Sequence, residues 1–276
     1  MRLPLHNVIP LTKIIFRTVA KYPVPLLKAF AWPALMIVLL SLVRMSLATF
    51  LPAPAIPLIP GIATGFLASL TLVNVVRYLD LDEEPPLDPR RIAWRAVTIV
   101  SLILIPLCVM LYACLVFVAV SQSAGVPAET TSDAWRGLLI MFAQFVIASL
   151  AMGVTYPLAG PIALLQRFEL KSSWRMIRDS LAALIMLASL LLVFVTFIEI
   201  AYLIVAANVF VLIKDSLSSM PHAEMVIASV FTIFGLPVVF FAMVLPAIAV
   251  AHLTQGLGRR ILESVMVLAS APEDQK

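Results

Sequence analysis

Charged residues are scarce in this sequence of 276 amino acids: they make up only 12%, whereas 62% are hydrophobic. A soluble domain carries about 25% charged residues. The scarcity excludes an ordinary soluble domain and indicates that lipid surrounds most of the chain. Because a backbone in hydrocarbon must satisfy its own N–H and C=O groups, only helices or closed β-barrels span membranes. The long apolar runs do not alternate with polar residues, and this favours helices.

Residues that carry catalysis or bind metals are also few. The three histidines, His6, His222 and His252, belong to distant parts of the chain, which speaks against a shared metal site. Cys108 and Cys114 are six residues apart and would lie on different faces of a helix. We therefore interpret them as small apolar side chains that form neither a disulfide nor a metal site. There is no HExxH, GxSxG or Walker-type glycine loop. We therefore expect no enzymatic activity, no metal and no cofactor.

Six apolar segments of about 20 residues or more are long enough to cross a bilayer of about 30 Å. Because the connections between them are short, we predict three helical hairpins in a single polytopic membrane domain that comprises residues 1–276. The expected fold is an all-α membrane protein of six transmembrane helices, which cover approximately residues 27–50, 57–76, 92–120, 137–165, 181–213 and 225–251.

The fifth segment is unusually long, about 50 Å if residues 181–213 form one helix. Such a helix must tilt strongly or project beyond the outer surface. The alternative is a break near Asn208, where two alanines precede the asparagine. The sequence leaves these possibilities open.

The basic residues predict the orientation of the six segments. Sixteen of the 19 Lys and Arg residues lie on one side, in the two termini and in the loops at 77–95 and 167–178. Only Arg136 and Lys214 lie on the other side, and membrane proteins keep basic loops in the cytoplasm. We therefore predict that both termini are cytoplasmic. The net charge of +4 has the same explanation, so we expect no nucleic-acid partner.

Three polar segments lie on this basic side. Residues 8–21 and 256–270 have an amphipathic pattern, which predicts short helices on the membrane surface with their Lys and Arg side chains near lipid headgroups. The acidic segment 80–86 contains two prolines and is typical of a solvated turn. Its alternative role is to dock a basic partner.

A weak threefold repeat accompanies the hairpins, because each odd-numbered segment begins with a basic residue followed closely by tryptophan. One interpretation is an ancestral hairpin copied three times. The other is that Trp and Arg simply mark the membrane interface in any protein. The pairs are Lys28 with Trp32, Arg91 with Trp94, and Lys171 with Trp174.

Small residues line one face of the second segment. Gly61, Gly65 and Ser69 recur every four residues, a spacing that lets another helix backbone approach closely in lipid. We favour a neighbouring helix within the same chain, and the alternative is a helix of another chain.

Two charged residues lie within the apolar segments, where charge is costly and often functional. Arg44 and Glu199 would both lie near the outer side of the membrane, with Gln144 of the fourth segment at a similar depth. One hypothesis is a structural ion pair between helices. The other is a polar site that opens to the outer side, and these three residues are its candidates.

Residues 161–178, Pro-Ile-Ala-Leu-Leu-Gln-Arg-Phe-Glu-Leu followed by Lys-Ser-Ser-Trp-Arg-Met-Ile-Arg, carry a family resemblance. Together with the basic N-terminal segment and six spans, they resemble the YciC-like group of bacterial membrane proteins. They also resemble the membrane domain attached to some glycerophosphodiester phosphodiesterases, although no phosphodiesterase domain is present here. The resemblance implies the bacterial inner membrane and no enzymatic role.

From these features we expect a non-enzymatic inner-membrane protein, an accessory or partner subunit of a larger membrane assembly. Its partners would be membrane lipid and other membrane-protein subunits. The alternative is a small-solute or lipid transporter in which Arg44, Gln144 and Glu199 line an outer vestibule.

Overall fold

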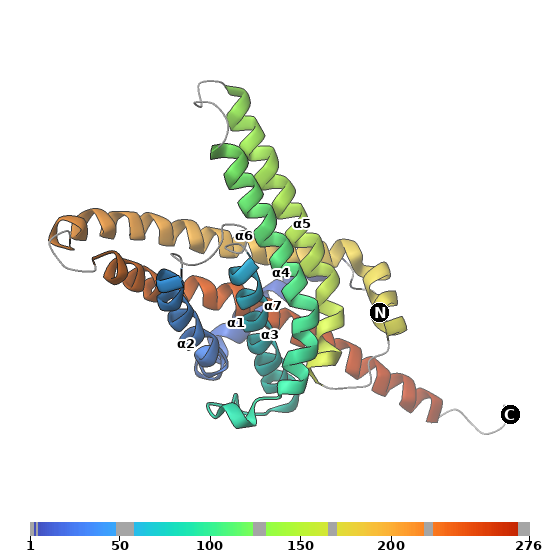
Figure 1. Cartoon of the computed structure of the whole chain (residues 1–276). Coiled ribbons are helices and arrows are strands. Elements are labelled where there is room, and N and C mark those ends of the chain that lie inside the picture. The colour runs from blue at the N-terminus through green and yellow to red at the C-terminus, as the bar shows by residue number, and fades with distance from the viewer. Residues whose placement is uncertain are drawn as a thin grey trace.

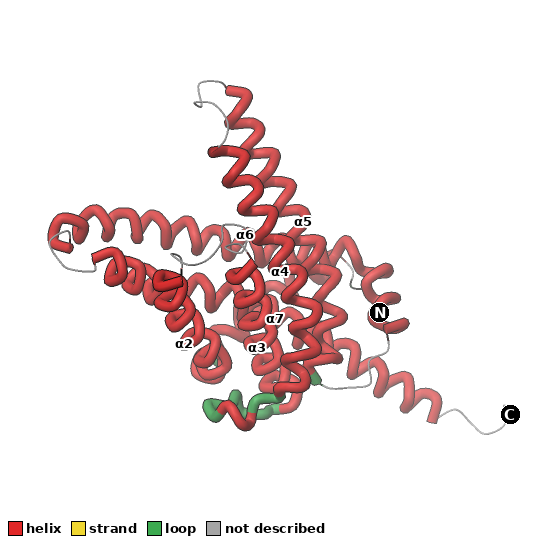
Figure 2. Tube along the Cα trace, viewed as in Figure 1, coloured by secondary structure: helices red, strands yellow, loops and turns green. Residues whose placement is uncertain are grey.

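The computed structural model describes the backbone of residues 3, 5–47, 58–123, 131–164, 170–217 and 223–269. Side chains at 42–47, 58, 114–123, 131–141, 143–144, 156, 170–172, 212–217, 223–229 and 256–269 lie outside this description. Throughout the described ranges the regular structure is helical and no strand occurs (Figure 2). The prediction of an all-helical fold is confirmed.

The helices follow one another with short connections (Figure 1). In chain order the described elements are η1 (Leu5–Asn7), α1 (Val8–Lys21), α2 (Pro23–Leu47), α3 (Leu58–Leu81), η3 (Pro89–Arg91), α4 (Trp94–Ser123), α5 (Thr131–Ala163), α6 (Leu170–Leu217) and α7 (Ala223–Ala269).

Five of the described helices, α2, α3, α4, α6 and α7, are long and apolar enough to cross a membrane. Helix α5 bends by 42° between two parts, Phe145–Thr155 and Pro157–Ala163. It supplies a sixth span if these two parts are counted as one. Pro157 lies at the bend, where its ring removes a backbone hydrogen bond and clashes with the preceding turn. The fold is that of a multi-pass helical membrane protein.

The long fifth segment is one continuous helix. Helix α6 runs through Asn208 without a break, and its 48 residues extend over about 72 Å. It also begins at Leu170, well before the predicted start at residue 181. Helix α7 likewise continues through Gly256 and Gly258 to Ala269, so the C-terminal amphipathic segment is the last part of α7 and no separate helix.

The buried core lies at one end of the bundle, close to the loop between α3 and α4. In α6 no side chain between residues 192 and 211 is buried, and in α4 none is buried between 102 and 113. Figure 1 shows why: the α4–α5 and α6–α7 hairpins extend from the shared core in different directions. The largest fully buried side chains include Ile15, Leu26, Leu70, Met176, Leu184, Leu187, Leu245 and Ile248.

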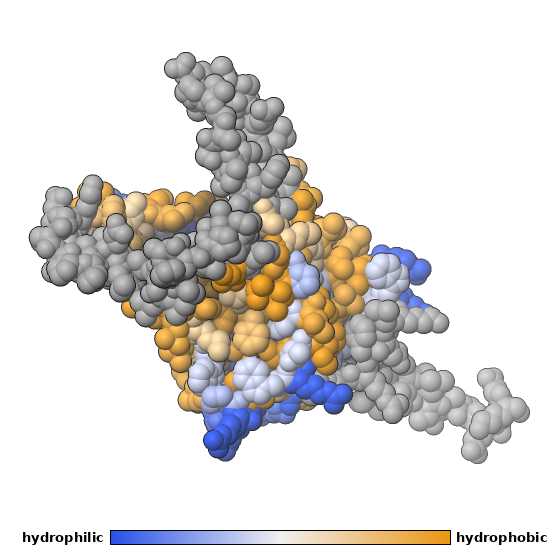
Figure 3. Space-filling model, in the orientation of Figure 1, coloured by the Kyte–Doolittle hydropathy of each residue, from blue (hydrophilic) through white to orange (hydrophobic). Residues whose placement is uncertain are grey.

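Polar surface gathers beside this core. Figure 3 shows an apolar surface over most of the described part and a hydrophilic patch at the lower edge, where Figure 1 places the α3–α4 connection. The patch and the core therefore meet at the same end of the bundle.

Candidate functional site

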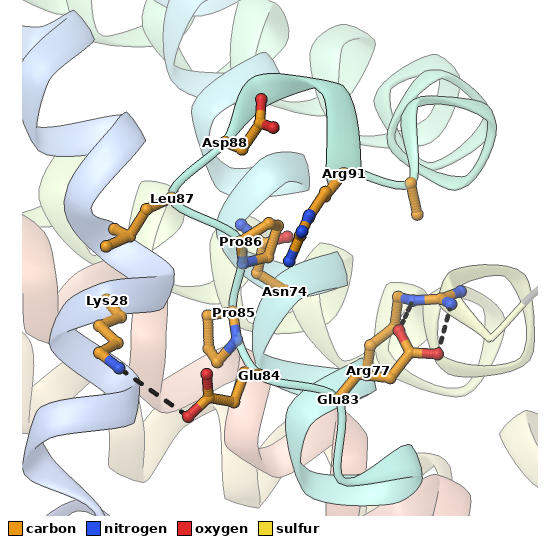
Figure 4. A pocket seen from close by; sticks show the side chains of 11 residues that line it. Lys28, Asn74, Arg77, Glu83, Glu84, Pro85, Pro86, Leu87, Asp88 and Arg91 are labelled. Atoms are coloured by element: carbon orange, nitrogen blue, oxygen red, sulfur yellow. Dashed lines mark hydrogen bonds and ion pairs between the residues drawn. The ribbon is translucent and has the colours of Figure 1, made fainter.

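A cavity of about 580 Å³ lies under the loop that connects α3 to α4 (Figure 4). Its wall combines helix and loop residues that are distant in the sequence, and most of them are charged or polar. They are Lys28, Asn74, Arg77, Glu83, Glu84, Pro85, Pro86, Leu87, Asp88, Arg91 and Ala93.

Several residues of the α3–α4 loop end α3 or prevent the chain from continuing as a helix. Asp82 has a φ of 55°, the left-handed conformation in which helices commonly end. Pro85 and Pro86 follow, and proline cannot continue a helix. The Asp88 carboxylate then accepts a hydrogen bond of 2.9 Å from the backbone N–H of Arg90 and caps η3. The chain therefore crosses the cavity in extended form before α4 begins.

Two tryptophans, one in α2 and one in α4, form hydrogen bonds with the backbone of the loop. The indole N–H of Trp32 in α2 donates to the carbonyl oxygen of Leu87 at 3.0 Å. The indole N–H of Trp94 in α4 donates to the carbonyl oxygen of Pro89 at 2.9 Å. Both ring systems are amphipathic and suit a membrane interface, where one edge is apolar and the other is wet.

The charges of the cavity are paired unevenly. Arg77 makes two hydrogen bonds of 2.8 Å to the Glu83 carboxylate, the bidentate geometry of a strong ion pair. Lys28 lies 4.0 Å from Glu84, whose side chain is 87% exposed, so this contact is weak. Arg91 makes no ion pair or hydrogen bond through its side chain within the described ranges, and Figure 4 shows it directed toward Asn74 and Pro86.

Asn74 forms a buried polar part of the wall. Its side chain is 4% exposed, and its amide nitrogen donates to the carbonyl oxygen of Ala29 in α2 at 3.5 Å. This contact links α3 to α2 beneath the loop. With three basic and three acidic side chains around it, the cavity is balanced in charge.

A second polar cluster connects α1, α7 and α3 in the same end of the bundle. The Thr18 hydroxyl lies 3.1 Å from Nε2 of His252 and also donates to the carbonyl oxygen of Ile14 at 2.9 Å. Since a hydroxyl carries one proton, His252 donates from Nε2 in this arrangement. The Gln255 amide donates to the carbonyl oxygen of Leu79 at 2.9 Å.

Asp80 adjoins this cluster. Both of its carboxylate oxygens are buried and have no hydrogen-bond partner in the part of the chain that the structure describes. The Gln255 side chain lies close to Asp80, and its amide donates to the carbonyl oxygen of Leu79. Among the described residues no group of three or more His, Cys, Asp or Glu side chains could hold a metal ion.

The small-residue stripe of α3 faces α4. A β-carbon on Gly61 would lie 2.8 Å from the Cα atom of Val109, and one on Gly65 would lie 2.6 Å from the Cα atom of Ile105. Ser69 is buried, and its hydroxyl donates to the carbonyl oxygen of Gly65 at 2.7 Å. The backbone of this stripe therefore packs directly on a helix of the same chain.

The three candidates for an outer polar site are described unequally. The side chains of Arg44 and Gln144 lie outside the described residues, and so does their predicted pairing with Glu199. Glu199 itself is exposed on α6 and makes no ion pair or hydrogen bond with any described side chain. The ion-pair prediction stays a prediction.

Sequence reasoning missed the cavity, because it interpreted the acidic segment 80–86 as a solvated turn or a docking site. The segment instead folds back on Arg77 and Lys28 of its own chain. A usable signal was present in the repeat: Lys28 and Arg91, its first two basic members, both line the cavity. Their tryptophan companions, Trp32 and Trp94, hold the loop.

In comparisons with protein-family models, with curated proteins and with solved structures, nothing matches this chain. The resemblance to the YciC-like group therefore stays a prediction from the residues at 161–178.

Proposed function

We propose that this protein is a non-enzymatic, integral inner-membrane protein of bacteria that acts as an accessory or partner subunit of a larger membrane assembly. The observation that supports the proposal best is the position of Glu199, a carboxylate exposed on the outer part of α6.

The outer part of α6 is apolar on its exposed faces. Phe197 is 68% exposed, Leu203 56% and Val211 70%, and none of the side chains between residues 192 and 211 is buried. Lipid tails cover such side chains as well as a protein does, so the apolar surface alone requires no partner.

Glu199 is different because lipid cannot solvate a carboxylate. On insertion scales a charged side chain costs about 2.5–3.5 kcal/mol at the centre of a membrane helix, which is an upper bound for Glu199 because we place it toward the outer side. A neighbouring helix that offers a hydrogen-bond donor or a cation removes this cost. A partner subunit packed on α6 would therefore be stabilised at Glu199, and its contact would be specific to that position.

The orientation is part of the proposal. Sixteen basic residues on one side against two on the other favour cytoplasmic termini. Helix α1 would then lie on the cytoplasmic surface, with Ile15 buried in the bundle and Ile9 and Ile14 exposed toward lipid. Fusion of a reporter that is active only in the cytoplasm to Lys276 should give signal; an inactive fusion of full expression level would contradict this orientation.

A photo-crosslinking experiment in membranes tests the subunit proposal. A photoreactive amino acid at Leu203, one turn from Glu199, should give a discrete adduct with a second protein. The same group at Leu102 of α4, which is 71% exposed, serves as the control and should give lipid adducts only. Purification in mild detergent as a lone monomer, together with identical patterns at both positions, would contradict the proposal.

The transporter alternative requires Arg44 and Gln144 beside Glu199 in an outer vestibule. Of these three residues only Glu199 has a described side chain, so no observation favours this alternative.

A further inference from the structure

The cavity under the α3–α4 loop is lined by two cations that no strong ion pair with a described side chain holds. Arg77 is committed to Glu83 through two hydrogen bonds of 2.8 Å. Lys28 is held only by a 4.0 Å contact to an exposed carboxylate, and such pairs contribute little. Arg91 has no ion pair with a described side chain and is directed into the cavity in Figure 4.

These two cations come from opposite walls. Lys28 belongs to α2, whereas Arg91 ends η3; both line the cavity, and Figure 4 shows Pro85 and Pro86 of the loop between their side chains. A group held by both must carry several acceptor oxygens. Phosphate does, and a guanidinium with an ammonium is a common way to bind it.

The same cavity also offers acceptors for a cation. Glu84 is 87% exposed, and moving its carboxylate away from Lys28 would cost little. Because three acidic side chains offset three basic ones, a purely anionic ligand gains no net attraction from the wall. A ligand with both a phosphate and an ammonium group satisfies both kinds of residue.

The surroundings indicate that such a ligand carries acyl chains. Trp94 binds the loop from the first residue of α4, and Trp32 binds it from α2, which begins at Pro23. Tryptophan is enriched at the level of lipid headgroups. Leu27 of α2 and Leu87 of the loop are exposed, at 57% and 59%, next to Lys28 and Asp88 in the sequence. Acyl chains would cover these side chains while the headgroup enters the cavity.

We propose that this cavity binds the headgroup of a zwitterionic, amine-bearing phospholipid. Arg91 and Lys28 hold its phosphate, and Glu84 accepts hydrogen bonds from its ammonium group. The volume of about 580 Å³ is in the range of small-ligand sites. The proposal does not depend on the subunit role, because the cavity is formed by this chain alone.

The test is a titration of the delipidated full-length protein in detergent, read by native mass spectrometry. The probes are dioleoyl phosphatidylethanolamine, dioleoyl phosphatidylglycerol and inorganic phosphate. We expect the wild-type protein to prefer phosphatidylethanolamine and to keep it in the presence of inorganic phosphate. Arg91→Gln should weaken the binding of both lipids roughly tenfold, the loss expected for one charge-assisted contact.

Glu84→Gln separates the two headgroups. It removes the negative charge that attracts both the ammonium group and Lys28, so affinity for phosphatidylethanolamine should fall while that for phosphatidylglycerol rises. Arg90→Gln is the matched control, because Arg90 is the neighbour of Arg91 in η3 but does not line the cavity. Lys28→Gln repeats the test from α2 if the variant at Arg91 does not fold.

Three results would overturn the proposal. The variants at Arg91 and at Lys28 could bind both lipids as tightly as Arg90→Gln does. Inorganic phosphate could displace the lipid at equal concentration, which would identify the site as one for a free anion. The wild-type protein could prefer phosphatidylglycerol, or Glu84→Gln could leave the relative affinity for the two lipids unchanged; either result would exclude recognition of the amine.

Discussion

Gly65 of α3 packs against Ile105 of α4 so closely that a β-carbon on Gly65 would lie 2.6 Å from the Ile105 Cα atom and 2.9 Å from its backbone nitrogen. These neighbours are backbone atoms and cannot rotate away as a side chain can. The contact between α3 and α4 therefore depends on the absence of a side chain at this position, as in other tightly packed membrane helices.

Gly65→Ala should separate the two helices and destabilise the protein by about 1–3 kcal/mol, the usual cost of overpacking. Gly235→Ala in α7 is the control, because a β-carbon there would lie 3.4 Å from the Tyr202 hydroxyl, an ordinary contact. Thermal unfolding in detergent measures both variants. Equal melting temperatures for the two would show that the α3–α4 contact can relax freely.

The contact between Thr18 and His252 should hold α1 against α7. Thr18→Val keeps the size of the side chain but removes the hydroxyl, leaving the His252 donor without its partner. We expect a loss of about 1 kcal/mol and faster hydrogen exchange in α1. Thr98→Val is the matched control, since the Thr98 hydroxyl is exposed and bonds only to the Trp94 carbonyl of its own helix. Unchanged exchange in α1 would contradict the role of this contact.

The bidentate pair of Arg77 and Glu83 should order the start of the α3–α4 loop. Glu83→Gln leaves one weaker hydrogen bond, and because the Glu83 side chain is 49% exposed we expect a cost of only about 0.5–1 kcal/mol. Hydrogen exchange of the loop should rise, whereas Glu84→Gln should leave stability unchanged, given its 4.0 Å contact. Raising the salt concentration should reduce the difference between the two variants.

Glu199→Gln distinguishes the proposed roles of the outer part of α6. For a subunit contact, we expect roughly tenfold less of the Leu203 crosslinked adduct at unchanged folded yield. Thr196→Val, one turn earlier on the exposed surface of α6, should not alter the adduct. Loss of transport with an unchanged adduct would instead support the transporter alternative. A fall in folded yield would indicate a structural ion pair with Arg44.

Several features of the fold could be predicted from the sequence alone. The share of charged residues is too small for an ordinary soluble domain, and apolar runs of membrane length predict the spans. These properties depend on residues that are neighbours along the chain. The boundaries were less accurate, as α6 shows by beginning at Leu170. Hydropathy marks where the chain can be in lipid, whereas a helix ends where its backbone hydrogen bonds stop.

The cavity depended on tertiary structure. The repeat sets Lys28 and Arg91 beside tryptophans, but it does not indicate that α2 and η3 line one cavity or that Asn74 forms part of its wall. The acidic loop shows the same limitation, because Glu83 pairs with Arg77 only after Asp82 has turned the chain back.

The sequence by itself determined that this chain is helical and apolar enough to cross a membrane several times, because composition and hydropathy act locally along each segment. The tertiary structure decided which charges are paired, which remain available, and that the Gly65 backbone packs on α4. Those features arise where segments that are distant in the sequence approach within a few ångströms. The residue pattern of one helix does not indicate which other segment packs against it.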